Sequence, residues 1–266
     1  MKYPHSLPKA HKELLHKILD VFCQDQRICG IGASGSYASD SMDQYSDLDL
    51  VIAVNPEDFS DVMAQRFELI QRVDGYVAAF TGDHVGEPRL VISIFEPNAV
   101  HIDFKFVSLP DAATRVDDTQ VLWERASQLT DTFATEKPNY PCPTPQWIED
   151  RFWIWVHYAA TKIARGEYFE TLEFISFLRQ NALSPLALKQ HGLTPSGVRT
   201  IEKRLPDFSN ELSKTVAFPE RQSLINAISQ CISLYLKLRE NEDIVANHHA
   251  QKICTEYFCR ELKTII

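Results

Sequence analysis

The chain has 266 residues, 44% of them hydrophobic and 24% charged, which allows one large domain or two smaller ones with buried cores. Its net charge of −9 argues against a long nucleic acid as partner, because proteins that grip many phosphates normally present a basic surface. No apolar run is long enough to span a membrane, and the N-terminus lacks the apolar core of a signal peptide. We therefore expect a cytoplasmic protein with no membrane partner.

The first predicted elements are a helix and a strand. Leucine, isoleucine and phenylalanine recur at three- and four-residue spacing over residues 6–26, which predicts an amphipathic helix. Ser6, with Pro8 just inside, provides a start signal for it. A strand is expected at 28–33, directly before a turn rich in glycine and serine.

The functional prediction rests on residues 30–52. Gly35 lets the backbone approach a ligand closely, and Ser36 opens a short helix with free N–H groups and a hydroxyl. Asp47 and Asp49 lie on one side of the next strand, about 7 Å apart by the strand rise. Two carboxylates on a rigid strand suit a hard divalent cation. Together these residues predict a site for a metal-bound triphosphate.

More strands follow a helix predicted from residue 56 to about 73. They are expected at 76–81, 90–95 and 101–107, and a tight turn at Glu96-Pro-Asn-Ala joins the last two. Alternation places His101, Asp103 and Lys105 on one face of the last strand. This polar face points either toward the metal site or, in the alternative, toward bulk water.

A change of pattern near residue 140 predicts a domain boundary. Four prolines within residues 138–145 indicate a semi-rigid linker, which gives domains at 1–140 and 141–266. The second domain is predicted to be all-helical, with Thr144 and Pro145 as the start signal of its first helix. Helices are expected at roughly 145–165, 168–182, 185–190, 194–204, 209–215, 219–240 and 242–264.

The helix at 145–165 carries a basic stripe on an otherwise acidic protein. Helical spacing aligns Arg151, Tyr158, Lys162 and Arg165 along one side. Such a stripe can close over the β- and γ-phosphates of a nucleotide and stabilise the leaving pyrophosphate. The alternative is a solvated helix face. Lys162 and Arg165 are the phosphate-binding candidates from this domain.

The motif at the start of the chain also resembles a known family. Gly35-Ser36, ten further residues and then Asp47-Leu48-Asp49 resemble the signature of the DNA polymerase beta-like nucleotidyltransferase superfamily. The run Asp43-Gln-Tyr-Ser-Asp-Leu-Asp looks most like the small-molecule antibiotic nucleotidyltransferases, particularly the lincosamide and aminoglycoside enzymes. Lys162-x-x-Arg-Gly-Glu resembles their helical domain more loosely.

This resemblance implies a fold, a reaction and a set of site residues. The fold is an α/β (α+β) nucleotidyltransferase domain with a small mixed sheet, followed by an all-α helical bundle. The reaction is Mg²⁺-dependent transfer of a nucleoside monophosphate, AMP from ATP in the first instance, to a hydroxyl of a small molecule. Asp47 and Asp49 hold metal, while Gly35 and Ser36 bind phosphate. Asp103 occupies the position of the third carboxylate, as a metal ligand or as the base that takes the hydroxyl proton.

Several alternatives stay open at the level of sequence. The acceptor can be a protein or RNA instead of a small molecule, although the acidic balance argues against RNA and against the tRNA and poly(A) polymerases of the superfamily. A nucleotide-binding regulator of the antitoxin type is another reading, against which the intact Ser36, Asp47, Asp49 and Asp103 argue. The nucleotide base, an antibiotic-resistance or housekeeping role, and a monomeric or homodimeric state are not determined.

Overall fold

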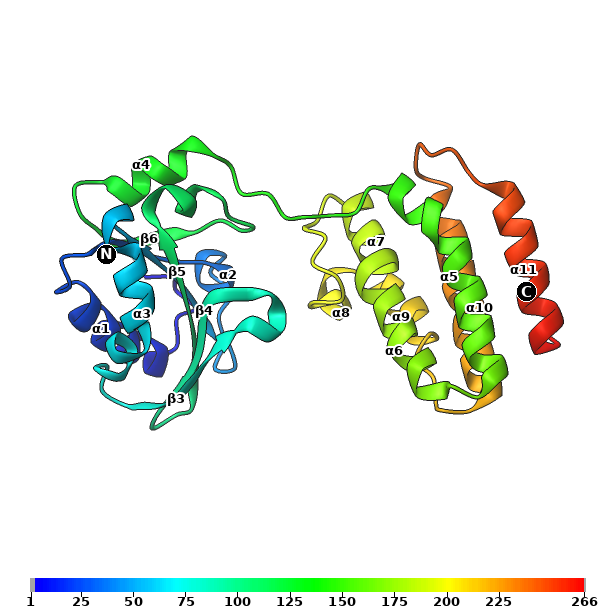
Figure 1. The fold of residues 1–266 in the computed structure, drawn as a ribbon, viewed down its shortest axis with the longest axis horizontal. Coiled ribbons are helices and arrows are strands. Elements are labelled where there is room, and N and C mark those ends of the chain that lie inside the picture. Colours follow the sequence, from blue (N-terminus) through cyan, green and yellow to red (C-terminus); the bar gives the residue numbers. More distant parts are fainter. Residues whose placement is uncertain (1–2, 266) are drawn as a thin grey trace. The chain divides into compact units, whose positions relative to one another are not determined.

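The computed structural model describes residues 3–265, which divide into two compact units between Asn139 and Tyr140 (Figure 1). Residues 137–144, which include three of the four linker prolines, form no helix or strand. Each unit has its own hydrophobic core and is described by itself. Among the described residues, no helix combines the length and the apolar character needed to cross a membrane.

A six-stranded mixed sheet, in the order β3-β4-β5-β2-β1-β6, forms the centre of the first unit. Its strands are β1 (Ile28–Ala33), β2 (Leu48–Val54), β3 (Tyr76–Gly82), β4 (Glu87–Phe95), β5 (Val100–Ser108) and β6 (Gln120–Glu124). β2 and β5 run parallel, and the other neighbouring strands are antiparallel. This is the small mixed sheet that the sequence predicted.

The helices of this unit cover the sheet. They are α1 (Lys9–Phe22), α2 (Gly35–Ala38), α3 (Phe59–Gln71) and α4 (Gln128–Thr135), with 3₁₀ turns at Pro56–Asp58, Asp83–Val85 and Leu109–Ala113. The apolar stripe of α1 packs on β5, where the Phe22 and Phe104 rings stack at 5.4 Å. α4 contributes Leu129 and Phe133 to a separate small cluster with Cys29 of β1. Because α1 covers the face of β5 formed by its even-numbered residues, the polar side chains of β5 lie on the opposite face, which its odd-numbered residues form.

Three details of the first unit differ from the prediction. α1 begins at Lys9 because the Ser6 hydroxyl accepts a hydrogen bond from the Met42 amide instead of capping the helix. The Ser6 amide donates to Asp40, so Ser6 anchors the loop that follows α2. β6 and α4 were not predicted at all.

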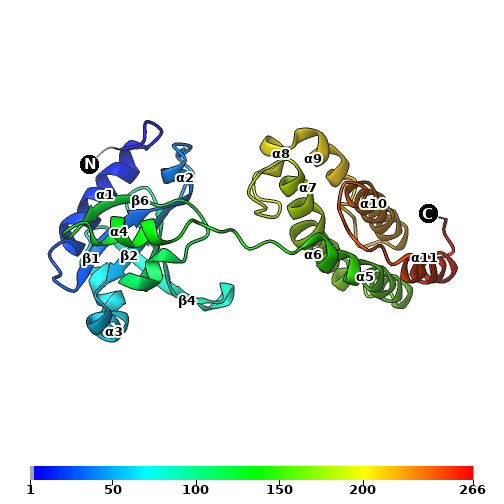
Figure 2. The ribbon, with the colours of Figure 1, turned by 90° about the horizontal axis from the view of Figure 1, so that it is seen from above.

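The second unit is helical, as predicted. Its helices are α5 (Pro145–Arg165), α6 (Tyr168–Leu178), α7 (Ser184–Gln190), α8 (Ile201–Arg204), α9 (Pro206–Ser213), α10 (Arg221–Arg239) and α11 (His248–Leu262), with a π-helical turn at Arg179–Leu183. α5, α10 and α11 lie side by side (Figures 1 and 2). The helix predicted at 194–204 is wrong for residues 194–200, where Pro195 and Gly197 favour turns, and the last helix begins at His248 rather than 242.

Candidate functional site

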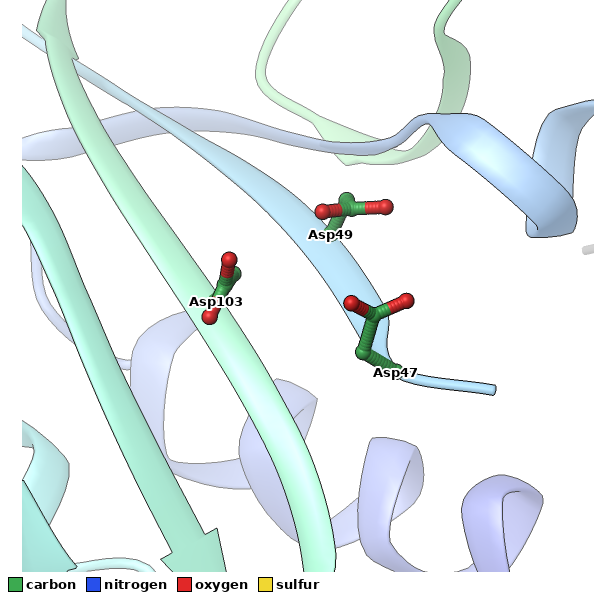
Figure 3. Close-up of side chains that lie close together, drawn as sticks. All are labelled: Asp47, Asp49 and Asp103. Carbon is green, nitrogen blue, oxygen red and sulfur yellow. The ribbon is translucent and has the colours of Figure 1, made fainter. Parts of the chain in front are cut away.

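Three aspartates from two neighbouring strands converge in the first unit (Figure 3). Asp47 directly precedes β2, Asp49 lies within it, and the parallel register pairs Asp49 with Asp103 of β5. One carboxylate oxygen from each of the three lies within 4.8 Å of the others, and all three residues are half-buried. The side chains thus come closer than the strand rise alone suggests, because they lean toward a common point. We call these residues the aspartate triad.

Local sequence explains how β2 presents its carboxylates. Leu48, Leu50 and Ile52 are fully buried on the opposite face, so a shift of one residue would expose them and bury the aspartates. The pairing with β5 fixes the third position in the same way, since Ile102 and Phe104 are also fully buried. The burial of the apolar residues therefore sets the register that assembles the triad.

Gly35 and Ser36 lie beside the triad at the start of α2. Gly35 has a positive φ of 60°, and a Cβ atom placed there would come to 2.4 Å from Asp49 Oδ2. Only glycine allows this close approach. The Ser36 hydroxyl oxygen is buried and has no hydrogen-bond partner among the described residues. Because buried polar groups are normally paired, this oxygen is available to a ligand.

The triad suits a divalent metal ion. Three converging carboxylate oxygens are the hard ligands that Mg²⁺ prefers, and Mg²⁺ keeps further positions for water and substrate phosphate. The unpaired Ser36 hydroxyl lies next to this donor set, at the start of a helix. The residues present therefore fit a metal together with a phosphate group. Asp47, Asp49 and Asp103 would hold the metal.

Further polar residues on the same face of β5 extend the site. His101 Nε2 lies 2.8 Å from Asp103 Oδ1, so the ring orients that carboxylate. Glu87 of β4 binds both Arg89, at 2.8 Å, and Lys105, at 3.1 Å. Hydrogen bonds from Arg89, and then from Lys105, lower the pKa of Glu87 to about 2. Sequence reasoning placed His101 and Lys105 on this face but missed Glu87 and Arg89, because the contact of Glu87 with Lys105 depends on the β4–β5 register.

Lys162 and Arg165 lie at the end of α5 in the second unit. Lys162 Nζ contacts Glu167 at 2.6 Å and Glu170 at 2.9 Å, and its side chain is only 16% exposed. These two carboxylates raise the pKa of Lys162, so its charge is permanent but already paired. Arg165 is more exposed and lies 3.9 Å from Glu167. The basic stripe is thus partly neutralised, and its binding to phosphate stays a prediction.

Comparisons with known proteins bear on the first unit. Residues 15–99 match the family model described as the nucleotidyltransferase domain. This range contains the second half of α1, Gly35, Ser36 and the two aspartates at the start of β2. No curated protein matches the chain significantly.

Two solved structures resemble the chain over most of its length. An aminoglycoside 6-adenyltransferase from Bacillus subtilis has 16% identity and a TM-score of 0.36, covering 96% of this chain and 92% of its own. A nucleotidyltransferase-like protein from Exiguobacterium sibiricum has 15% identity and a TM-score of 0.38, covering 94% and 91%. At this level of similarity, neither one identifies the substrate of this chain.

Proposed function

We propose that this chain, a nucleotidyltransferase whose first unit is the nucleotidyltransferase domain, transfers AMP from Mg²⁺-ATP to a hydroxyl of a small molecule. Antibiotics are one class of acceptor in this proposal. The observation that carries it is the convergence of the three triad carboxylates beside Gly35 and the unpaired Ser36 hydroxyl. Three converging carboxylates beside a close backbone approach and an unpaired hydroxyl suit a metal-bound phosphate group.

Each residue has a stated role in the proposal. Asp47 and Asp49 hold Mg²⁺, while the Gly35 backbone and Ser36 hydroxyl donate hydrogen bonds to phosphate oxygens. Asp103 completes the metal site or accepts the proton of the attacking hydroxyl, and His101 keeps its carboxylate in position. A bound Mg²⁺ would neutralise phosphate charge and lower the pKa of a coordinated hydroxyl.

The bonds balance in a single in-line displacement. The acceptor oxygen forms a bond to the α-phosphorus as the bond from this phosphorus to the pyrophosphate oxygen breaks. The hydroxyl proton leaves to Asp103 or to water, and the pyrophosphate departs with the electron pair. We further propose that residues 141–266 act as a helical domain to the transferase domain at 1–140, with Lys162 and Arg165 stabilising the leaving pyrophosphate.

Substitution of the triad tests this function. Asp47→Asn or Asp49→Asn should lower pyrophosphate release from Mg²⁺-ATP, measured with a panel of hydroxylated acceptors, by at least a hundredfold, because an amide is a neutral and weak metal ligand. Asp131→Asn, on the exposed side of α4, is the matched control and should keep full activity.

The outcome can contradict the proposal clearly. Unchanged pyrophosphate release in either triad variant, with wild-type circular dichroism, would show that the triad is not the site of the reaction. Failure of the wild-type protein to release pyrophosphate from any acceptor, or to bind Mg²⁺-ATP, would reject the function itself.

A further inference from the structure

The first unit has a pocket of about 600 Å³ at the end of the sheet where β2 and β5 begin. Three segments form its wall: the start of α1, the residues before β2, and the turn that leads into β5. Pro8 and Ala10 of the first segment line the pocket, together with Tyr45 and Ser46 of the second and Asn98 of the third. A volume of this size is typical of small-molecule sites.

Two residues connect this pocket to the triad. Ser46 lines the pocket and directly precedes Asp47, and His101 lines it while bonded to Asp103 at 2.8 Å. Just before β2, Asp47 therefore directly follows a residue of the pocket wall, and on β5, Asp103 is hydrogen-bonded to one. A molecule held in the pocket is next to the carboxylates that the proposed reaction uses.

The strand order places one wall of the pocket on the other side of the triad from the phosphate-binding residues. α2 follows β1, which pairs with β2 on the side away from β5, and Gly35 approaches Asp49 from there. The turn at 96–99 and His101 belong to the β4–β5 side. In-line displacement requires the attacking oxygen and the leaving pyrophosphate on opposite sides of the phosphorus. The wall formed by residues 98–101 thus lies across the triad from Ser36, on the side that an acceptor would occupy.

The wall is polar and has no carboxylate, ammonium or guanidinium group among the described residues that line it. Its side chains offer the amides of Gln44 and Asn98, the hydroxyl of Tyr45 and two imidazole rings, together with apolar surface from Pro8 and Ala10. No Asp, Glu, Lys or Arg is among the described residues that line it. A polycationic ligand would lose hydration here without gaining a carboxylate partner, apart from the triad that the metal would occupy.

A buried histidine adds an unused acceptor to the wall. His11 is 4% exposed, and its Nε2 donates to the Ser46 carbonyl oxygen at 2.7 Å. Because that carbonyl can only accept, Nε2 carries a proton, and in the neutral tautomer of the ring Nδ1 is an acceptor. Nδ1 has no hydrogen-bond partner among the described residues. A ligand hydroxyl at the wall is a suitable donor to it.

We infer that this pocket is the acceptor subsite and that it takes an uncharged, polyhydroxylated ring molecule, such as a neutral glycoside. This inference rests on the proposed function, which it deepens by naming the acceptor class. Sugar hydroxyls match the amides, the tyrosine hydroxyl and the imidazole acceptor, while the C–H face of a sugar ring packs on apolar and aromatic surface. Tyr45, which is 85% exposed beside the triad, offers such a ring.

The test fills the pocket and measures binding directly. Methyl β-maltoside is the neutral probe and kanamycin the polycationic one, and calorimetric titration without nucleotide gives their affinities. Wild-type protein should bind the maltoside, and Ala10→Phe should weaken this binding at least tenfold by filling the pocket. Lys9→Phe adds the same ring to the neighbouring residue, which is exposed and outside the wall, and should bind as the wild type does.

A second variant and a second readout complete the test. Asn98→Ala, in an exposed turn, removes one amide without filling space and should weaken maltoside binding severalfold. With Mg²⁺-ATP, Ala10→Phe should raise the KM for the maltoside tenfold and leave the KM for ATP within twofold. Binding of kanamycin alone, no binding of the maltoside, or equal affinity in Ala10→Phe and wild type would overturn the inference. Maltoside binding that Ala10→Phe abolishes, without pyrophosphate release, would keep the pocket and reject the proposed function instead.

Discussion

At the scale of single residues, the contact between Gly35 and Asp49 determines how the triad is held. The α carbon of Gly35 approaches so closely that the Asp49 carboxylate occupies the space in which any other residue would place its Cβ atom. The same backbone has a left-handed conformation. A substitution at this position therefore has two separable effects, strain in the backbone and displacement of a proposed metal ligand.

Gly35→Ala should abolish Mg²⁺-dependent activity. The added methyl group must push Asp49 away, while the left-handed backbone costs about 1–2 kcal/mol of stability. Gly86→Ala is the matched control, since Gly86 has a φ of 77° with nothing within 4 Å of its Cβ position. It should lower the melting temperature similarly but keep activity. Equal activity of the two variants would contradict the proposed role of Asp49.

The residues of the site differ in how far the sequence predicted them. The nucleotidyltransferase domain predicted from Gly35-Ser36 and Asp47-Leu48-Asp49 is confirmed by the family model that matches residues 15–99, because fixed spacing on a turn and a strand is visible in the sequence. The contact of Glu87 with Lys105 could not be predicted, since it depends on which residues of β4 and β5 face each other. The ion pairs of Lys162 with Glu167 and Glu170 were not predicted, because they depend on the turn after α5.

At the scale of elements, strands and long helices were predicted best. β4 and β5 carry the β-branched and aromatic residues that are typical of buried strands, and α5 has both a capping residue and an apolar stripe. β6 is short and ends in polar residues, so only its pairing with β1 makes it a strand. α1, α10 and α11 turned out shorter than their apolar spacing suggested, because such patterns continue into the capping loops.

Three helices of the second unit share one buried carboxylate. Glu149 of α5 has no exposed side-chain surface. It accepts hydrogen bonds from Tyr235 and Arg239 of α10, from Trp153 of its own helix, and from the Asn247 amide at the start of α11. Burial alone would raise its pKa, but these hydrogen bonds and the Arg239 charge together lower it. The carboxylate therefore links α5, α10 and α11 in its ionised form.

Glu149→Ala should lower the free energy of unfolding by about 3–5 kcal/mol, because it leaves Arg239 and three other donors without their partner. Glu256→Ala, which breaks an exposed pair with Lys252 at 4.0 Å, should cost less than about 1 kcal/mol. Urea titration measures both free energies.

The stabilisation by Glu149 should also depend on pH. Since the folded pKa of Glu149 is lowered, its contribution to stability is present above the ordinary glutamate pKa of about 4.3 and is lost as the pH falls further. A Glu149→Gln variant should show a weaker loss of stability in acid.

At the scale of the whole molecule, two separate cores predict two responses to metal. The triad belongs entirely to the first unit, so Mg²⁺ should raise the unfolding midpoint of that unit and leave the helical unit unchanged. At a hundred times its Kd, a ligand adds about 2.7 kcal/mol, which corresponds to several degrees. Calorimetry with and without EDTA measures the effect. Asp49→Asn should remove it, and a shift that persists in this variant would place the metal elsewhere.

The parallel pairing of β2 with β5 also has a kinetic consequence. Asp49 and Asp103 meet only after two strands that are distant in the chain have found their register, with α3, β3 and β4 between them. Long-range pairing of this kind forms late in folding, after the local turns and helices. The triad therefore does not exist while the sheet is being assembled, and Mg²⁺ cannot guide the chain toward its fold. The bound ion should therefore lower the unfolding rate and leave the folding rate unchanged.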